Sequence, residues 1–162
     1  MNLKNYEIIS QIGNGTFGKV YKIKKRNTDE LFAAKVMKFL IDPEEQESNN
    51  TISDLKKEAS IMMKINHPSI VKFYKLDTTY FNGFNSPTLI LEYMPNGSLA
   101  DIIKLERDSN AHEFWNDTRK LINIYGIANA MSYLHANGII HRDLKPDNIL
   151  MDTYLFPKIA DF

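Results

Sequence analysis

The stretch HRDLKPDN, residues 141–148, brings reactive side chains of several chemical kinds close together in the sequence. The carboxylate of Asp143 can orient a hydroxyl group and accept its proton, and the ammonium group of Lys145 can neutralise a phosphoryl group in transfer. The amide oxygen of Asn148 can bind Mg²⁺. Asp161 follows at the end of a short strand-like run, where a carboxylate can bridge a metal ion to phosphate groups. These side chains have the chemistry that metal-assisted phosphoryl transfer requires.

A glycine-rich run near the other end of the sequence, GNGTFGKV, has Gly13, Gly15 and Gly18 in the pattern Gly-x-Gly-x-x-Gly. Glycine lets the backbone approach a phosphate group closely and adopt positive φ angles. Dinucleotide-binding folds use the same pattern, but there a helix follows the third glycine. Here the run KVYKIKK follows, which alternates like a strand. We therefore expect a hairpin whose glycines lie over a nucleotide.

Lys35 lies in the next strand-like run, FAAKVMK, among apolar neighbours. A single lysine on a strand is usually an exposed charge, but its place on the strand beside the glycine hairpin favours a role toward phosphate. A buried ammonium group needs a counter-charge, because an unpaired buried charge is costly. Glu58, on the helix predicted next, is the candidate partner. The residues alone leave open that Glu58 is exposed and pairs with a neighbouring lysine instead.

Strands and one helix are predicted to carry these residues in the first part of the chain. The runs YEIISQIG, GKVYKIKK and LFAAKVMKF place apolar residues at about every second position, with the polar turn RNTDE before the third. After the acidic loop IDPEEQESNN, Thr51 and Asp54 have capping-box spacing, and a helical stripe then runs to NHP. Two more strands are predicted, at residues 70–77 and 87–94. The helical stripe comprises Leu55, Ala59, Met62 and Met63.

The second part of the chain is predicted to be mainly helical. A short helix is expected at Leu99–Leu105, and a long amphipathic helix at Trp115–Ala136, which Asn137 and Gly138 close. Short strands around the polar loop 141–148 complete the chain, so the fold class is α+β. The stripe of the long helix comprises Leu121, Ile124, Tyr125, Ala128, Met131 and Leu134.

Composition limits the possible functions. A length of 162 residues predicts one domain, and the balance of 20 basic and 20 acidic residues gives no argument for nucleic acid or a membrane surface as a partner. The absence of cysteine fits a reducing compartment, and without a targeting signal a cytoplasmic location is the default. No second histidine or cysteine stands at metal-binding spacing, so structural or solvated roles are expected for His67, His112 and His135.

These motifs, in this order, resemble those of the eukaryotic protein kinases. GNGTFGKV resembles the glycine-rich loop, AAK the strand-three lysine motif, HRDLKPDN the catalytic loop, and ADF the opening of the Asp-Phe-Gly motif. The letters DLKP resemble serine/threonine kinases, whereas NGSL and GIANAMSYLHANGIIHRD resemble the tyrosine-kinase-like group. The resemblance implies a complete small lobe at 1–92 with a five-stranded antiparallel sheet and one helix, a hinge at 93–97, and the first part of a helical large lobe at 98–162.

The resemblance also implies roles for single residues, with ATP and Mg²⁺ as cofactors. Lys35, held by Glu58, would contact the α- and β-phosphates. Asp143 would be the catalytic base, with Lys145 near the γ-phosphate, and Asn148 and Asp161 would bind Mg²⁺. Leu91 would be the gatekeeper, with the backbones of Glu92 and Met94 meeting adenine. The nucleotide-binding set would be Ile12, Gly13, Asn14, Gly15, Thr16, Phe17, Gly18, Val20, Ala33, Lys35, Leu91, Glu92, Met94 and Leu150. A stack resembling the regulatory spine would comprise Met62, Phe73, His141 and Phe162.

The sequence ends at ADF, inside the Asp-Phe-Gly motif that begins at Asp161, which predicts a fragment of a kinase. The expected function is transfer of the γ-phosphoryl group of Mg-ATP to a serine or threonine hydroxyl of a protein substrate. The alternative is a nucleotide-binding or interaction module with no catalysis of its own. With the rest of the large lobe absent, we expect the apolar stripe of the long helix to be partly exposed. The sequence does not indicate the substrate or the oligomeric state.

Overall fold

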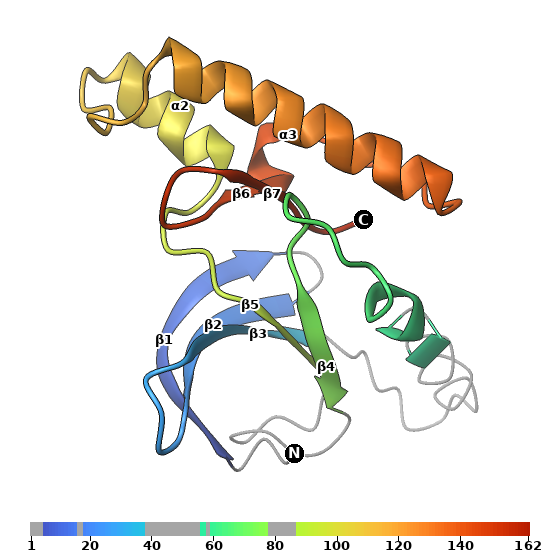
Figure 1. Cartoon of the computed structure of the whole chain (residues 1–162). Helices are drawn as coiled ribbons and strands as arrows, with labels where there is room; N and C mark the ends of the chain where they lie inside the picture. The colour runs from blue at the N-terminus through green and yellow to red at the C-terminus, as the bar shows by residue number, and fades with distance from the viewer. Residues whose placement is uncertain (1–4, 16–17, 38–55, 58, 78–86) are drawn as a thin grey trace. The chain divides into compact units, whose positions relative to one another are not determined.

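The computed structural model describes residues 5–15, 18–37, 56–57, 59–77 and 87–162. They belong to two compact units (Figure 1). The first unit consists of Met1–Ile65 and Lys72–Tyr93, and the second of Asn66–Val71 and Met94–Phe162. The segment 66–71 therefore belongs to the second unit although its sequence neighbours on both sides belong to the first.

A five-stranded antiparallel sheet forms the first unit, as the alternating sequence predicts. Its strands are ordered β1-β2-β3-β5-β4, so β4 forms one edge (Figure 1). The apolar side chains of one face form a core cluster of Tyr6, Tyr21, Ile23, Ala34, Val36 and Ile90. The strands are β1 (Tyr6–Gly15), β2 (Gly18–Lys25), β3 (Leu31–Met37), β4 (Phe73–Asp77) and β5 (Thr88–Glu92).

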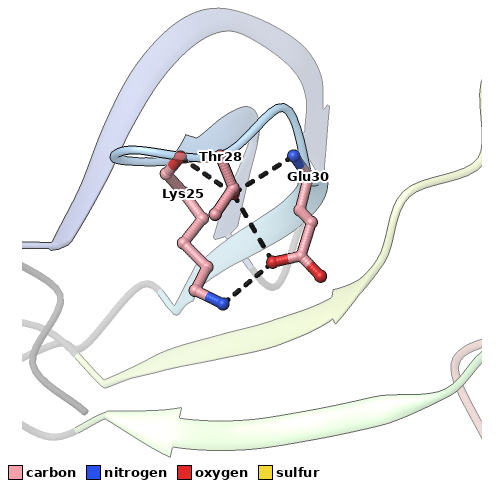
Figure 2. Close-up of polar contacts among 3 residues, drawn as sticks. All are labelled: Lys25, Thr28 and Glu30. Atoms are coloured by element: carbon pink, nitrogen blue, oxygen red, sulfur yellow. Dashed lines mark hydrogen bonds and ion pairs between the residues drawn. The ribbon is translucent and has the colours of Figure 1, made fainter.

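The turn between β2 and β3 is fixed by three polar residues (Figure 2). The hydroxyl of Thr28 donates to the carbonyl oxygen of Lys25 at 3.2 Å and accepts a hydrogen bond from the backbone N–H of Glu30 at 3.3 Å. The ammonium group of Lys25 contacts the carboxylate of Glu30 at 2.8 Å. Since turn geometry sets hairpin register, these contacts help to place Val20 directly opposite Lys35.

Two predictions for the first unit need correction. The fourth strand begins at Phe73 rather than Ile70, because Ile70 forms a parallel bridge with Ile159 and the N–H of Val71 donates to the carbonyl of Ile159. The predicted helix is present at residues 56–57 and 59–62. Of its predicted apolar stripe Ala59 is buried, but Met63, just beyond the helix, is exposed. The predicted cap residues Thr51 and Asp54, with Leu55 and the loop 41–50, lie outside the described residues.

The second unit contains two helices and a short hairpin. Helix α2 (Leu99–Arg107) begins with a capping box between Ser98 and Asp101 and runs two residues further than predicted. Helix α3 (Asp117–Ala136) begins at Asp117 rather than Trp115, because the side chain of Asn116 caps it by accepting from the N–H of Arg119 at 2.9 Å. A 3-10 turn, Pro146–Asn148, precedes the hairpin of β6 (Ile149–Met151) and β7 (Pro157–Ile159). The core of this unit comprises Ile102, Trp115, Ile149, Met151 and Leu155.

Helix α3 packs with a face other than the predicted stripe. Gly126 approaches β7 so closely that an added Cβ would lie 2.9 Å from Cγ of Pro157. The buried residues of α3 lie at helical spacing on either side of this contact: Asn123, Ala130 and Leu134. Of the predicted stripe only Leu134 is buried, whereas Leu121, Ile124 and Tyr125 are 66%, 64% and 72% exposed, which agrees with the expected partial exposure.

The described residues thus confirm the α+β class, with a five-stranded antiparallel sheet, a helix in the same unit and further helices in the second. Among the helices of these residues, none combines the length and the apolar character that crossing a membrane requires.

Candidate active site

The loop 141–148 is held in shape by its own backbone. The N–H of Asp143 donates to the carbonyl of His141 at 2.9 Å, and the N–H of Asn148 donates to that of Lys145 at 2.9 Å. Arg142 between them has a φ angle of 64°, in the left-handed region that non-glycine residues rarely adopt. Pro146 stands in the first turn of the 3-10 helix, where its missing N–H costs nothing. The loop therefore presents the side chains at 143, 145 and 148 on one short, tightly bonded segment.

Two donors meet on one carboxylate oxygen of Asp143. Oδ2 lies 2.8 Å from the ammonium nitrogen of Lys145 and 2.9 Å from the amide nitrogen of Asn148. These contacts lower the pKa of the Asp143 carboxyl, with the hydrogen bond from Lys145 as the largest cause and that from Asn148 as the second. The same bond to Asp143 raises the pKa of Lys145, with smaller contributions from Asp147 and Asp161. The pair therefore stays ionised as carboxylate and ammonium.

The hairpin β6–β7 brings the backbone of Ala160, the residue before Asp161, against the backbone of Asn148. Ile149 pairs with Ile159, and the N–H of Ala160 donates to the carbonyl oxygen of Asn148 at 2.9 Å. Asn148 is further oriented by its amide nitrogen, which donates to the carbonyl oxygen of Asp143 at 2.8 Å. Asp161 has a φ angle of 57°.

Sequence reasoning predicted short strands here but not that β6 and β7 pair with each other, which brings Ala160 to the backbone of Asn148. The signal for it was present as the two short apolar runs, ILM and PKI, on either side of a turn. In the described part of the chain, no cluster of three or more histidine, cysteine, aspartate or glutamate side chains could hold a metal ion.

The ring of His141 is buried beside Phe162, with ring centroids 6.3 Å apart. Its Nε2 has no hydrogen-bond partner among the described residues. Nδ1 lies 3.4 Å from the N–H of Asp143, a long and weak hydrogen bond. These two residues of the predicted stack are thus in contact. Its other members, Met62 and Phe73, belong to the first unit, and the stack of four stays a prediction.

The residues predicted to bind the nucleotide from the first unit share one face of the sheet. Gly13 lies opposite Val20, Val20 opposite Lys35, and Ala33 opposite Leu91. Directly opposed residues of antiparallel strands point to the same face, so these five lie on the face opposite the core cluster. Lys35 is half-buried there.

The remaining residues of the nucleotide-binding set are placed less uniformly. Ile12 stands at a register irregularity of β1 and is exposed, and Asn14 and Gly15 end the same strand. Gly18 has a φ of 149°, and a Cβ there would lie 2.0 Å from the carbonyl oxygen of Val36, so only glycine fits. Thr16, Phe17 and Glu58 lie outside the described residues, and the Lys35–Glu58 pair stays a prediction.

Met94 and Leu150 belong to the second unit. Met94 is buried, and Leu150 is half-buried on β6, where it pairs with Lys158 and forms a bridge with Ser98. The turn between Met94 and α2 is attached to β6, because the N–H of Met151 donates to the carbonyl of Gly97 at 2.9 Å.

Two of the three histidines outside the motif have structural contacts. The ring of His67 packs against Tyr133, and its Nδ1 accepts from the N–H of Ser69 at 3.1 Å. Burial, and then the charge of Lys158, lower its pKa. His112 accepts from the N–H of Phe114 at 3.2 Å through Nδ1. His135 lies exposed in the last turn of α3.

Comparison with known proteins agrees with the motifs. The sequence model of the protein kinase domain matches residues 6–162. An Aurora kinase of Saccharomyces cerevisiae is 35% identical over 162 residues, which are 100% of this chain and 40% of that protein. The serine/threonine-protein kinase AtPK1/AtPK6 of Arabidopsis thaliana is 34% identical over 165 residues, covering 100% of this chain and 32% of the relative.

A human relative, NUAK family SNF1-like kinase 1, is 33% identical over 162 residues, covering 99% of this chain and 22% of the relative. The chain thus spans at most 40% of the length of these three relatives. Because the family model covers nearly the whole chain and every motif lies within the match, the chain belongs to the protein kinase domain family.

Proposed function

We propose that the protein containing this chain is an ATP-dependent protein kinase that transfers the γ-phosphoryl group of Mg-ATP to serine or threonine hydroxyls of a protein substrate. The main structural support is that the side chains of Lys145 and Asn148 both donate hydrogen bonds to the same oxygen, Oδ2, of Asp143. Membership of the kinase family supports the reaction, and relatives named as serine/threonine kinases support the choice of acceptor.

Asp143 is proposed to orient the acceptor hydroxyl. In the described part of the chain both side-chain hydrogen bonds to its carboxylate end on Oδ2, so Oδ1 is the oxygen left for a substrate hydroxyl. Its lowered pKa makes the carboxylate a weak base, which favours orientation first and acceptance of the proton late, as the hydroxyl bonds to phosphorus. Lys145, whose pKa is raised, brings a fixed positive charge to the same point.

Asn148 and Asp161 are proposed to hold Mg²⁺. Their oxygens are the hard ligands that Mg²⁺ prefers, and Mg²⁺ commonly uses one or two protein ligands together with substrate phosphates. The donor set fits this arrangement, because the amide nitrogen of Asn148 is already used by Asp143 and its oxygen remains. When bound, Mg²⁺ would neutralise charge on the phosphate oxygens.

The small lobe is proposed to be 1–92, with 93–97 as the hinge and 98–162 as the first part of the large lobe. Lys35 would contact the α- and β-phosphates with Glu58 as its counter-charge, and the glycine run would cover the phosphates. The shared sheet face of Val20, Ala33 and Leu91 supports an apolar adenine site there. The backbones of Glu92 and Met94 would meet the adenine edge.

The kinase group, the partner and the location are proposed from the sequence alone. NGSL and the run before HRD favour the tyrosine-kinase-like group, while the relatives named above carry other kinase names. The proposed partner is a protein substrate, with no nucleic acid or membrane. The proposed location is cytoplasmic, which a sequence without cysteine fits.

The test is phosphate transfer from γ-labelled ATP with Mg²⁺ to a general protein substrate such as casein, using the natural full-length protein. Asp143→Asn is expected to lower the rate at least about 10²-fold while ATP binding is retained. Asp147→Asn, which removes an exposed carboxylate from the same loop, is the matched control. Unchanged turnover of Asp143→Asn would refute the assignment, and ATP binding without any transfer by the wild type would favour the non-catalytic module.

A further inference from the structure

Glu92, the last residue of β5, is joined twice to the backbone of Lys72. Its own N–H donates to the carbonyl oxygen of Lys72 at 2.9 Å. Its carboxylate oxygen Oε2 accepts from the N–H of Lys72 at 3.1 Å. The carboxylate thus occupies the place of a backbone acceptor and extends the β4–β5 pairing beyond the pair Phe73–Leu91.

This contact is made with the backbone of Lys72 and not with its side chain. The ammonium nitrogen of Lys72 lies 5.3 Å from the ring centroid of Tyr74, a cation–π distance. The hydrogen bond to Glu92 therefore does not use the ammonium group of Lys72. An exposed surface ion pair would behave differently, because it would depend on that charge and contribute little.

The residue after Glu92 is held from another strand. The ammonium nitrogen of Lys22, on β2, lies 4.8 Å from the ring centroid of Tyr93. Lys22 pairs with Ala33, so it belongs to the sheet face that carries the proposed adenine residues. The chain that leaves β5 is thus bonded at Glu92 to Lys72, the residue before β4, and is contacted at Tyr93 by the side chain of Lys22 on β2.

We infer that Glu92 is a positioning residue for adenine recognition, acting through its carboxylate on the backbone of residue 92. The inference rests on the proposed function, in which that backbone meets adenine. A hydrogen bond to a charged acceptor is stronger than one to a neutral acceptor, so the carboxylate favours one orientation of this peptide. A backbone fixed before binding loses less conformational entropy when the ligand arrives, so ligand affinity rises.

The test compares adenosine with Mg²⁺-tripolyphosphate as ligands of the natural full-length protein, by isothermal titration calorimetry. Glu92→Ala is expected to weaken adenosine binding about tenfold, or 1.4 kcal/mol, and to leave tripolyphosphate binding unchanged. Glu92→Gln keeps an acceptor oxygen and is expected to restore most of the adenosine affinity. Lys72→Ala keeps the backbone N–H and is the matched control, with wild-type affinity. Hydrogen exchange at the Lys72 amide is expected to accelerate in Glu92→Ala alone.

Four results would overturn the inference. They are unchanged adenosine affinity in Glu92→Ala, an equal loss of both ligands, failure of Glu92→Gln to restore binding, and unchanged amide exchange at Lys72. Adenosine affinity that persists while exchange at Lys72 accelerates would refute the positioning role and leave the kinase assignment intact. A wild-type protein that binds neither adenosine nor ATP would refute both.

Discussion

The ammonium nitrogen of Lys145 lies 2.8 Å from Oδ2 of Asp143, two residues away along the chain. Both side chains are substantially exposed, so the contact contributes little to stability, and its consequence is chemical. It favours the ionised form of the carboxylate and, in the proposed function, leaves Oδ1 for the acceptor hydroxyl. The pKa of Asp143 therefore depends on the charge of Lys145, and the pKa of Lys145 on the charge of Asp143.

Replacing Lys145 is expected to raise the pKa of Asp143 toward the ordinary aspartate value of 3.8. The hydrogen bond from Lys145 is the largest cause of the lowered pKa, and losing it removes the preference for the charged form. In Lys145→Met the carboxyl carbon signal of Asp143 in a ¹³C NMR titration is expected to change at higher pH than in the wild type. Lys104→Met, on α2, is the control. A midpoint that stays in place or falls in Lys145→Met would contradict the prediction.

Lys35→Met is expected to lower phosphate transfer at least about 10²-fold, as for other groups placed at the reacting phosphates. The reason is its place on the sheet face of Gly13 and Val20, directly opposite Val20. The matched control is Lys19→Met, because Lys19 is exposed and pairs with Val36 of the core face. The measurement is the rate of phosphate transfer from γ-labelled ATP. An equal fall in this rate in Lys35→Met and Lys19→Met would argue against a specific role of Lys35.

Much of the first unit follows from the sequence, because alternation with period two identifies strands and a polar turn fixes their register. For helix α3, the sequence pattern does not predict which face packs against the rest of the unit. Between Lys120 and Arg142 the sequence has no charged residue, so it is apolar on several sides and periodicity alone cannot choose the packed face. The choice is made by Gly126, whose missing side chain admits Pro157.

In the candidate site, too, some contacts are predictable from the sequence and others are not. Asp143, Lys145 and Asn148 are neighbours in one motif, and their proximity is predictable from the sequence. The bond between the carboxylate of Glu92 and the backbone of Lys72 joins residues 20 positions apart. The residue type at position 72 does not predict this hydrogen bond, because every residue except proline has the same backbone N–H. The start of β4 at Phe73 could not be predicted from the sequence for a similar reason. The backbone N–H of Val71 bonds to Ile159 of β7, and any residue except proline could make this bond.

Gly126→Ala is expected to destabilise the protein although alanine is the better helix former. A Cβ at this position would lie 2.9 Å from Cγ of Pro157 and 3.0 Å from the hydroxyl oxygen of Ser69. Overpacking costs about 1–3 kcal/mol, against a gain of about 1 kcal/mol in helix propensity. Urea unfolding is expected to show a lower free energy of unfolding than in the wild type. Ser132→Ala, on the exposed side of α3, is the control, and a Gly126→Ala variant at least as stable as the wild type would disprove the close contact.

Asn148→Ala is expected to raise the Mg²⁺ concentration needed for half-maximal transfer. The substitution removes a proposed Mg²⁺ ligand and also the hydrogen bond at 2.9 Å that helps to orient Asp143. Loss of groups that hold or orient metal ligands commonly lowers metal affinity about 10–100-fold, so a shift of at least tenfold is expected. Asn137→Ala, which removes an exposed amide at the end of α3, is the control.

Mg²⁺ titrations of the transfer rate at saturating ATP separate the two effects of Asn148→Ala. A lost ligand moves the Mg²⁺ midpoint, and excess Mg²⁺ then recovers part of the rate. A disordered Asp143 lowers the maximal rate at every Mg²⁺ concentration, because the acceptor hydroxyl is no longer oriented. We expect both changes in this variant and only the second in Asp143→Asn. A midpoint shared by the wild type and Asn148→Ala would show that Asn148 acts on Asp143 alone and does not hold the metal.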